Sequence, residues 1–287
     1  VMLKFLPLFL VFLFTSYIFA QSPGGVSGSI EVWVKADAGV LDTGGSSISD
    51  GEAVGTWQDQ SGSMSNDAVD DNLASPAWYD SILNYNPVIE FDGDDDGLDF
   101  GNDYIYSTGT GMDWFAVLQP NTEVDKTRQL VLDFGLYSTQ GYGFMYGSET
   151  YGFHTPENDG GEVTQDQTHS RGTLPTLVSF RIDFNNNQSM AFNGASAVAT
   201  QSISSLDDLT SSNINEASTH SDYNGPVTIG HQSKTQNLSG NGGRMYSGAM
   251  AELIGYSIVL TDANRNRVET YLALKYGLTL SHNYIAD

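Results

Sequence analysis

The segment Met245-Tyr-Ser-Gly-Ala-Met-Ala-Glu-Leu-Ile-Gly-Tyr-Ser-Ile-Val-Leu260 decides the fold of this chain, together with the helix expected after it. Small and large apolar residues alternate along the segment with almost no charge, which is typical of a strand covered on both faces. Strands and turns dominate the preceding sequence. A lone helix after many strands has to bury its apolar face on a sheet. The sequence therefore predicts an all-β sandwich closed by one C-terminal helix.

The expected helix has clear start and stop signals. Thr261 and Asp262 offer N-cap oxygens, and Gly277 is a typical C-terminal stop. Between them, apolar residues recur at i, i+4 and i+8 on one helical face, at Val268, Leu272 and Tyr276. Tyr271 and Leu274 flank this face, and we expect the whole face to pack on the sheet.

Two parts of the chain together point to a known family. The closing block contains Ala251-Glu-Leu-Ile-Gly-Tyr256, Leu260-Thr-Asp-Ala263 and Arg267-Val-Glu-Thr-Tyr-Leu-Ala-Leu-Lys-Tyr-Gly277. Near the start stand Trp57-Gln-Asp-Gln-Ser-Gly62 and Asn66-Asp-Ala68. These segments resemble the laminin-G-like (concanavalin A-like) jelly-roll domains of large secreted bacterial surface proteins. The resemblance covers roughly Ile30 to Leu280 and implies a two-sheet antiparallel β-sandwich with one helix docked on it.

The N-terminal residues predict export from the cell. Lys4 precedes an apolar run from Leu6 to Ala20, which has the charge, length and position of a secretory signal peptide. About fifteen apolar residues are fewer than the roughly twenty that a membrane-spanning helix needs. We therefore expect a secreted or cell-surface protein with no membrane insertion after cleavage. The predicted organisation is a signal peptide, a linker, one jelly-roll domain and a C-terminal tail that could begin a linker to a further domain, at 1–20, 21–29, 30–280 and 281–287.

Composition excludes several classes of protein. The chain has 35 acidic and 11 basic residues, a net charge of −24, and no cysteine. Phosphate backbones and anionic membranes would be repelled, so a nucleic-acid partner is excluded. The lack of thiols excludes a cysteine nucleophile and a cysteine-ligated zinc site. The acidic excess either keeps the protein soluble or supplies ligands for calcium.

One acidic turn has the spacing of a calcium loop. In Phe91-Asp-Gly-Asp-Asp-Asp-Gly-Leu98, aspartates stand at every second position from 92 to 96. Glycine follows at 97 and a later acid at 103. The candidate ligands are Asp92, Asp94, Asp96 and Asp103. The alternative is a solvated acidic hairpin, because the flanking sequence predicts strands rather than the helices of an EF-hand.

One strand offers aromatic rings as a candidate ligand platform. In Gly141-Tyr-Gly-Phe-Met-Tyr-Gly147, the aromatic residues share one face and the glycines leave the other nearly bare. Aromatic faces are apolar platforms on which sugar rings can stack. The candidate binding residues are therefore Tyr142, Phe144 and Tyr146. The alternative is that the three rings fill the core of the sandwich.

Two further patterns predict local structure. Ile30-Glu-Val-Trp-Val-Lys35 alternates, so Ile30, Val32 and Val34 should face one way and Trp33 the other. Asn193-Gly194 between apolar segments, 189–192 and 195–198, is a strong hairpin signal.

Motifs for catalysis are absent from the sequence. It contains no G-x-S-x-G elbow, no H-E-x-x-H pair, and no Glu-x-Asp-x-x-Glu strand of the kind that jelly-roll glucanases carry. The sequence therefore favours a non-catalytic binding or adhesion module, with a glycan or another cell-surface polymer as partner. Further domains or copies of the same surface protein are also candidate partners. The alternatives are a structural spacer or assembly subunit of a surface appendage, and a glycoside hydrolase or lyase with carboxylates from distant strands.

Overall fold

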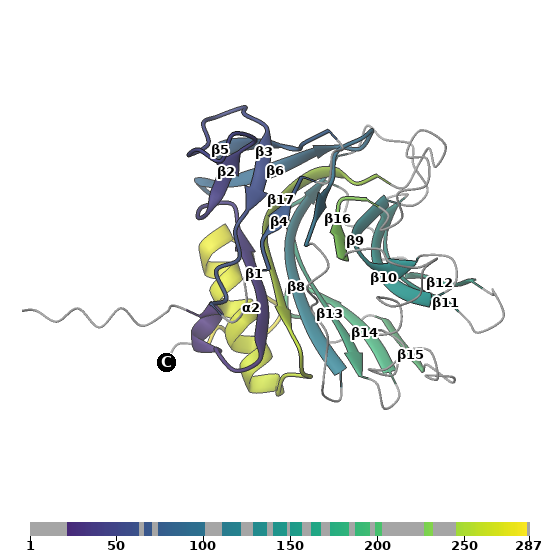
Figure 1. Cartoon of the computed structure of the whole chain (residues 1–287). Coiled ribbons are helices and arrows are strands. Elements are labelled where there is room, and N and C mark those ends of the chain that lie inside the picture. Colours follow the sequence, from purple (N-terminus) through teal and green to yellow (C-terminus); the bar gives the residue numbers. More distant parts are fainter. Residues whose placement is uncertain are drawn as a thin grey trace, which may run out of the picture.

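The chain forms two antiparallel β-sheets packed face to face, with one helix on the outer face of the first sheet (Figure 1). This architecture confirms the predicted β-sandwich jelly roll with a C-terminal helix. The computed structural model describes residues 22–62, 66–70, 74–100, 111–121, 129–136, 140–147, 150–156, 162–167, 173–183, 187–195, 199–202, 227–231 and 245–285. The predicted signal peptide, 1–20, lies outside these residues.

Among the described residues, the first sheet has eight strands and the second has nine. The first sheet runs in the order β15 (Ala199–Ser202), β14 (Asn187–Phe192), β13 (Thr176–Asp183), β8 (Gly111–Pro120), β17 (Ser247–Tyr256), β6 (Asn86–Asp92) and β5 (Ala77–Leu83), with β1 (Ile30–Lys35) also paired to β17. The second runs in the order β12 (Glu162–Gln167), β11 (Thr150–Pro156), β10 (Gln140–Gly147), β9 (Gln129–Leu136), β16 (Val227–Ile229), β7 (Leu98–Asp99), β4 (Ala68–Val69), β3 (Val54–Trp57) and β2 (Val40–Asp42).

Strand β17 is buried along its whole length, as the sequence predicts. One edge pairs with β8, and the other is shared by β6 and β1. A register shift between Met250 and Glu252 adds Ala251 as an extra residue on β17. The bulge changes the alternation, so that Met250 and Leu253 both face the core between the sheets while Ile254 faces the helix.

The helix α2 (Asp262–Tyr276) has the predicted ends. The backbone N–H of Asn264 donates to the Thr261 side chain, and Gly277 adopts the left-handed conformation with φ of 68°. The predicted face is buried in the cluster between α2 and the first sheet, at Val268, Leu272 and Tyr276. Leu274 is 67% exposed, so the prediction that it flanks the packed face is wrong. At about 100° per residue, Leu274 lies about 200° around the helix from Leu272, on the opposite face.

The segment predicted as a linker, 21–29, packs against α2 where it is described. A short 3-10 helix, η1 (Pro23–Gly25), contacts the helix so closely that a Cβ on Gly24 would lie 2.4 Å from the Arg267 carbonyl oxygen. The hydroxyl of Tyr256 donates to the carbonyl of Val26 at 3.0 Å. These residues therefore belong to the folded domain, and the linker prediction is wrong for residues 22–29.

The C-terminal tail is also fastened to the domain as far as Ile285. The N–H of Ser281 donates to the Asn193 carbonyl at 2.8 Å, and His282 Nε2 lies 2.8 Å from Glu269 Oε2. The N–H of Ile285 donates to the Thr270 hydroxyl. The predicted boundary at residue 281 therefore does not separate the tail from the jelly-roll domain.

Two local structures differ in detail from what the sequence predicts. Val32 and Val34 face the core between the sheets and Trp33 faces the other way, as predicted. Ile30 joins Trp33 on the helix side, because β1 carries a register shift between Ile30 and Val32. Asn193 and Gly194 adopt φ values of 46° and 68° and form the predicted turn, and the described return strand is β15.

The tryptophan-containing signature near the start of the domain has a structural role. Trp57 is fully buried. Asp59 accepts hydrogen bonds from the backbone N–H groups of Trp33 and Ser61 at 2.8 and 2.9 Å, and from the Ser61 hydroxyl. The amide of Asn66 donates to the Glu31 carbonyl. These bonds tie the turn after β3 to strand β1.

A buried carboxylate joins β17, β1 and α2. Glu252 is 1% exposed and accepts from the indole N–H of Trp33 and from the hydroxyl of Tyr276, the latter at 2.8 Å. The ammonium of Lys275 lies 2.8 Å from the same carboxylate and 2.9 Å from Asp37. Burial, followed by the nearby Glu252 charge, raises the pKa of the Tyr276 hydroxyl. The tyrosine therefore stays a hydrogen-bond donor to Glu252.

We predict that Glu252→Ala lowers the free energy of unfolding by about 3 kcal/mol, measured by urea denaturation, because it leaves the Trp33 N–H unsatisfied and Lys275 without its buried partner. Glu90→Ala is the matched control, since Glu90 is exposed on the neighbouring strand β6, and it should change stability by less than about 0.5 kcal/mol. Equal effects of the two substitutions would contradict this role.

Candidate functional site

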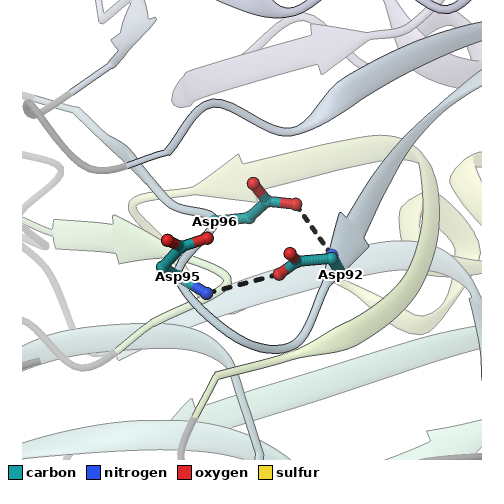
Figure 2. A group of neighbouring side chains, drawn as sticks. All are labelled: Asp92, Asp95 and Asp96. Carbon is teal, nitrogen blue, oxygen red and sulfur yellow. Dashed lines mark hydrogen bonds between the residues drawn. The ribbon is translucent and has the colours of Figure 1, made fainter. Parts of the chain in front are cut away.

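The acidic turn lies between β6 and β7 and is organised by its own aspartates. Asp92 Oδ1 accepts the backbone N–H groups of Asp94 and Asp95 at 2.7 and 3.3 Å. Asp96 Oδ2 accepts the backbone N–H of Asp92 at 2.7 Å. Figure 2 shows the bonds from Asp95 to Asp92 and from Asp92 to Asp96. Two of the carboxylates therefore close the turn and fix its shape.

The turn is also held against the start of β17. Gly93 has a φ of 80°, and a Cβ there would lie 2.6 Å from the Ser247 side chain. The backbone N–H of Ser247 in turn donates to the Gln129 side chain at 2.7 Å. Only glycine fits this left-handed position so close to a neighbour. The position of the aspartates is therefore set by the sheet as well as by the turn.

Three carboxylates of the turn meet in space. Asp92, Asp95 and Asp96 each offer an oxygen, and these atoms all lie within 4.8 Å of one another (Figure 2). The predicted set contained Asp92 and Asp96, but the structure groups Asp95 with them rather than Asp94. The fourth predicted ligand, Asp103, lies outside the described residues. Three hard oxygen donors fit a calcium ion, which prefers carboxylate and carbonyl ligands.

The carboxyl of Asp96 is the least solvated of the three. It is 6% exposed, whereas Asp92 and Asp95 are exposed. Burial raises the pKa of Asp96 to about 6. The hydrogen bond from the Asp92 N–H lowers this pKa, and the charges of Asp92 and Asp95 raise it further. A bound divalent cation would favour the ionised form of all three carboxyls.

The aromatic platform predicted on β10 is not supported at its central residue. Phe144 is fully buried, and its ring stacks on Phe180 of β13 at 5.4 Å with an interplanar angle of 20°. It therefore fills the core between the sheets, which is the alternative that the sequence left open. Tyr142 and Tyr146 lie on β10, but their side chains are outside the described residues.

Three buried acids that the sequence left unassigned serve the interface between α2 and the sheet. Asp113 pairs with Arg181 through two bonds of 2.7 and 2.8 Å and accepts the backbone N–H of Leu260 just before the helix. Glu269 lies beside Arg265 and accepts from the Ser179 hydroxyl at 3.0 Å. The third is Glu252. The i, i+4 spacing of Arg265 and Glu269 was a usable sequence signal for one of them.

Comparison with known proteins gives a partial family match. A family model described as a domain of unknown function (DUF8202) matches residues 264–287, which include most of α2 and the C-terminal tail. None of the curated proteins matches the chain.

Solved structures share the fold at low sequence identity. The receptor-binding domain of the botulinum neurotoxin C/D mosaic serotype matches with a TM-score of 0.57 and 10% identity, over 89% of this chain and 55% of that one. The binding domain of botulinum neurotoxin serotype D matches with a TM-score of 0.53 and 11% identity, over 90% of this chain and 56% of that one. The chain thus spans about half the length of these structures. At this identity, the matches show a shared β-sandwich jelly-roll fold.

A carbohydrate-binding module of the Ruminococcus gnavus IT-sialidase, in complex with α2,3-sialyllactose, also matches. Its TM-score is 0.41 and its identity 15%, over 54% of this chain and 80% of that one.

The described residues of the present chain include no helix of the length and apolar character needed to cross a membrane.

We predict that Asp96→Asn gains stability relative to the native chain as pH rises, in the presence of chelator. The folded pKa of about 6 exceeds the unfolded value of 3.8, so the stability that Asp96 contributes is complete below pH 3.8 and lost as pH rises through 6. Asparagine keeps an acceptor for the Asp92 N–H and does not titrate.

The difference in unfolding free energy between the variant and the native chain should shift by about 2 kcal/mol between pH 4 and pH 8 in urea denaturation. Asp94→Asn removes an exposed carboxylate from the same turn and should change stability by less than about 0.5 kcal/mol. Parallel stability curves for the native chain and Asp96→Asn would show that the buried carboxyl does not behave as described.

Proposed function

We propose that this protein is an exported, non-catalytic binding module that recognises glycans at the cell surface. The observation that carries the proposal is the sandwich fold, shared over 89% of the chain with a toxin domain described as receptor-binding. Export is supported by the N-terminal sequence, where a basic residue precedes the apolar run from Leu6 to Ala20.

The position of the buried acids also favours binding over hydrolysis. Glycoside hydrolysis on such a fold needs two carboxyl groups about 5 to 10 Å apart beside the sugar. The buried Asp113 pairs with Arg181, Glu252 with Lys275, and Glu269 with Arg265. All three lie beneath α2 and stabilise its contact with the sheet. The role of these three carboxylates is structural, and the other buried acids of the described residues, Asp96 and Asp133, lie elsewhere.

We predict that the chain from Gln21 to Asp287 binds at least one polysaccharide in a depletion assay and releases no reducing sugar from it. The assay uses insoluble cellulose, xylan, mannan and β-1,3-glucan, with alginate as an anionic polymer. Reducing-sugar release from a bound polymer would support the hydrolase alternative instead. Absence of binding together with concentration-dependent self-association in ultracentrifugation would support a structural or assembly subunit.

We further propose that the acidic turn binds calcium through Asp92, Asp95 and Asp96. The three convergent oxygens and the raised pKa of Asp96 support this proposal, because a cation would neutralise a buried carboxylate held close to two others. Its role would be structural, since it would hold the β6–β7 connection against the start of β17.

Calcium at about a hundred times its dissociation constant should stabilise the native chain by about 2.7 kcal/mol and raise its melting temperature by roughly 5–10 °C relative to chelator. The measurement is thermal unfolding followed by circular dichroism. Asp96→Asn should lose this response. Asp94→Asn should keep most of it, since Asp94 is outside the group of three carboxylates. Identical melting in calcium and chelator would leave the turn as a solvated acidic hairpin.

A further inference from the structure

The hairpin between β5 and β6 has an unusual residue at its tip. Leu83 pairs with Asn86, which leaves Asn84 and Tyr85 as a two-residue loop. Their φ values are 48° and 63°, so both lie in the left-handed region. Such a loop favours asparagine followed by glycine, because a Cβ is strained at positive φ. A bulky side chain in this region is an outlier that calls for a physical explanation.

The same chain contains the expected form of this turn elsewhere. Asn193 and Gly194 have φ values of 46° and 68°, close to those of Asn84 and Tyr85. Gly194 fits tightly there, since a Cβ would lie 2.5 Å from the His282 ring. The two turns thus share similar φ values and differ at their second residue. At the β5–β6 tip, the position that favours glycine carries the largest side chain of the hairpin loop.

Packing does not explain the tyrosine. Its side chain is 90% exposed, the highest value among the exposed large hydrophobic residues that the structure describes. The neighbouring Ile82 is 55% exposed, and Ser81 is a further residue with positive φ, at 57°. Because burial contributes almost nothing at Tyr85, its ring does not offset the strain of its backbone.

The tip is nevertheless held firmly against the end of α2. The side-chain amides of Asn84 and Asn86 both donate to the carbonyl oxygen of Lys275, at 2.9 and 3.0 Å. Asn84 also packs against Gly277, where a Cβ would lie 3.1 Å from its side chain. The backbone that carries the aromatic ring is therefore held in place, and the ring is presented to solvent.

We propose that Tyr85 is the ring on which an uncharged sugar stacks, so that the β5–β6 tip is the contact point of the glycan-binding function proposed above. This inference rests on that proposed function. Aromatic faces are apolar platforms for the C–H face of a sugar, and the exposed Asp80 and Ser81 on the same hairpin offer oxygens for its hydroxyls. The net charge of −24 opposes an anionic sugar, which selects the uncharged class.

The test measures binding of the native chain and its variants to the panel of cellulose, xylan, mannan, β-1,3-glucan and alginate. Tyr85→Ala should weaken binding to a neutral polymer about tenfold, and Tyr85→Phe should retain it within about threefold, since the ring rather than the hydroxyl makes the contact. Leu174→Ala, which removes another exposed apolar side chain, is the control and should bind like the native chain.

Unchanged binding by Tyr85→Ala, with the native chain bound, would overturn this inference and leave the proposed glycan function intact. Failure of the native chain to bind any polymer of the panel would overturn both. Binding to alginate alone would overturn the assignment of an uncharged sugar.

A second variant tests the tip without any ligand. Tyr85→Gly relieves the positive φ and should raise the melting temperature by about 2–4 °C, although glycine also gains freedom in the unfolded chain. A fall in melting temperature on this substitution would show that the tyrosine serves the fold, which would overturn the inference.

Discussion

The buried carboxylate of Glu252 lies where β17, β1 and α2 meet, and a charge in that position has to be paired and hydrogen-bonded. Its partners come from the first strand of the domain and from the last turn of the helix, so the two ends of the domain are joined through one side chain. The other end of α2 is fixed by Arg181 and Asp113. Arg181 donates to the carbonyl of Leu260, and Asp113 accepts from its N–H. The helix is thus fixed at both ends, which explains how a short amphipathic segment covers the outer face of the sheet.

On its helix side, the sheet is covered at Trp33 of β1, Val117 of β8 and Ile254 of β17. The candidate sites lie instead at the two ends of β6, a strand that pairs with β17 on one edge and with β5 on the other. Tyr85 precedes Asn86 at one end, and Asp92 begins the acidic turn at the other. A strand of this length spans roughly 20 Å. The aromatic tip and the acidic turn are therefore separate features, and a single sugar ring cannot contact both.

The sequence predicted the large elements well because their signals depend on burial. The helix face at Val268, Leu272 and Tyr276 and the fully covered strand β17 follow from hydrophobic periodicity alone. Alternation failed where a bulge added a residue, as for Ile30, since a one-residue shift exchanges the two faces of a strand. The grouping of Asp95 in place of the predicted Asp94, and the choice between the two roles left open for Phe144, have a different reason. Which face of β10 is covered, and which carboxylates converge, depends on parts of the chain distant in sequence.

The two candidate sites share an energetic property that the core lacks. Tyr85 adopts a backbone conformation that glycine would adopt more easily, and Asp96 keeps a carboxyl where burial raises its pKa. Each residue reduces the stability of the ligand-free fold, whereas the paired charges under α2 and the aromatic core increase it. Residues that lower the stability of the fold are expected at binding sites, where the free energy of ligand binding offsets the loss. We therefore place the proposed glycan contact and the proposed calcium site at the two ends of β6.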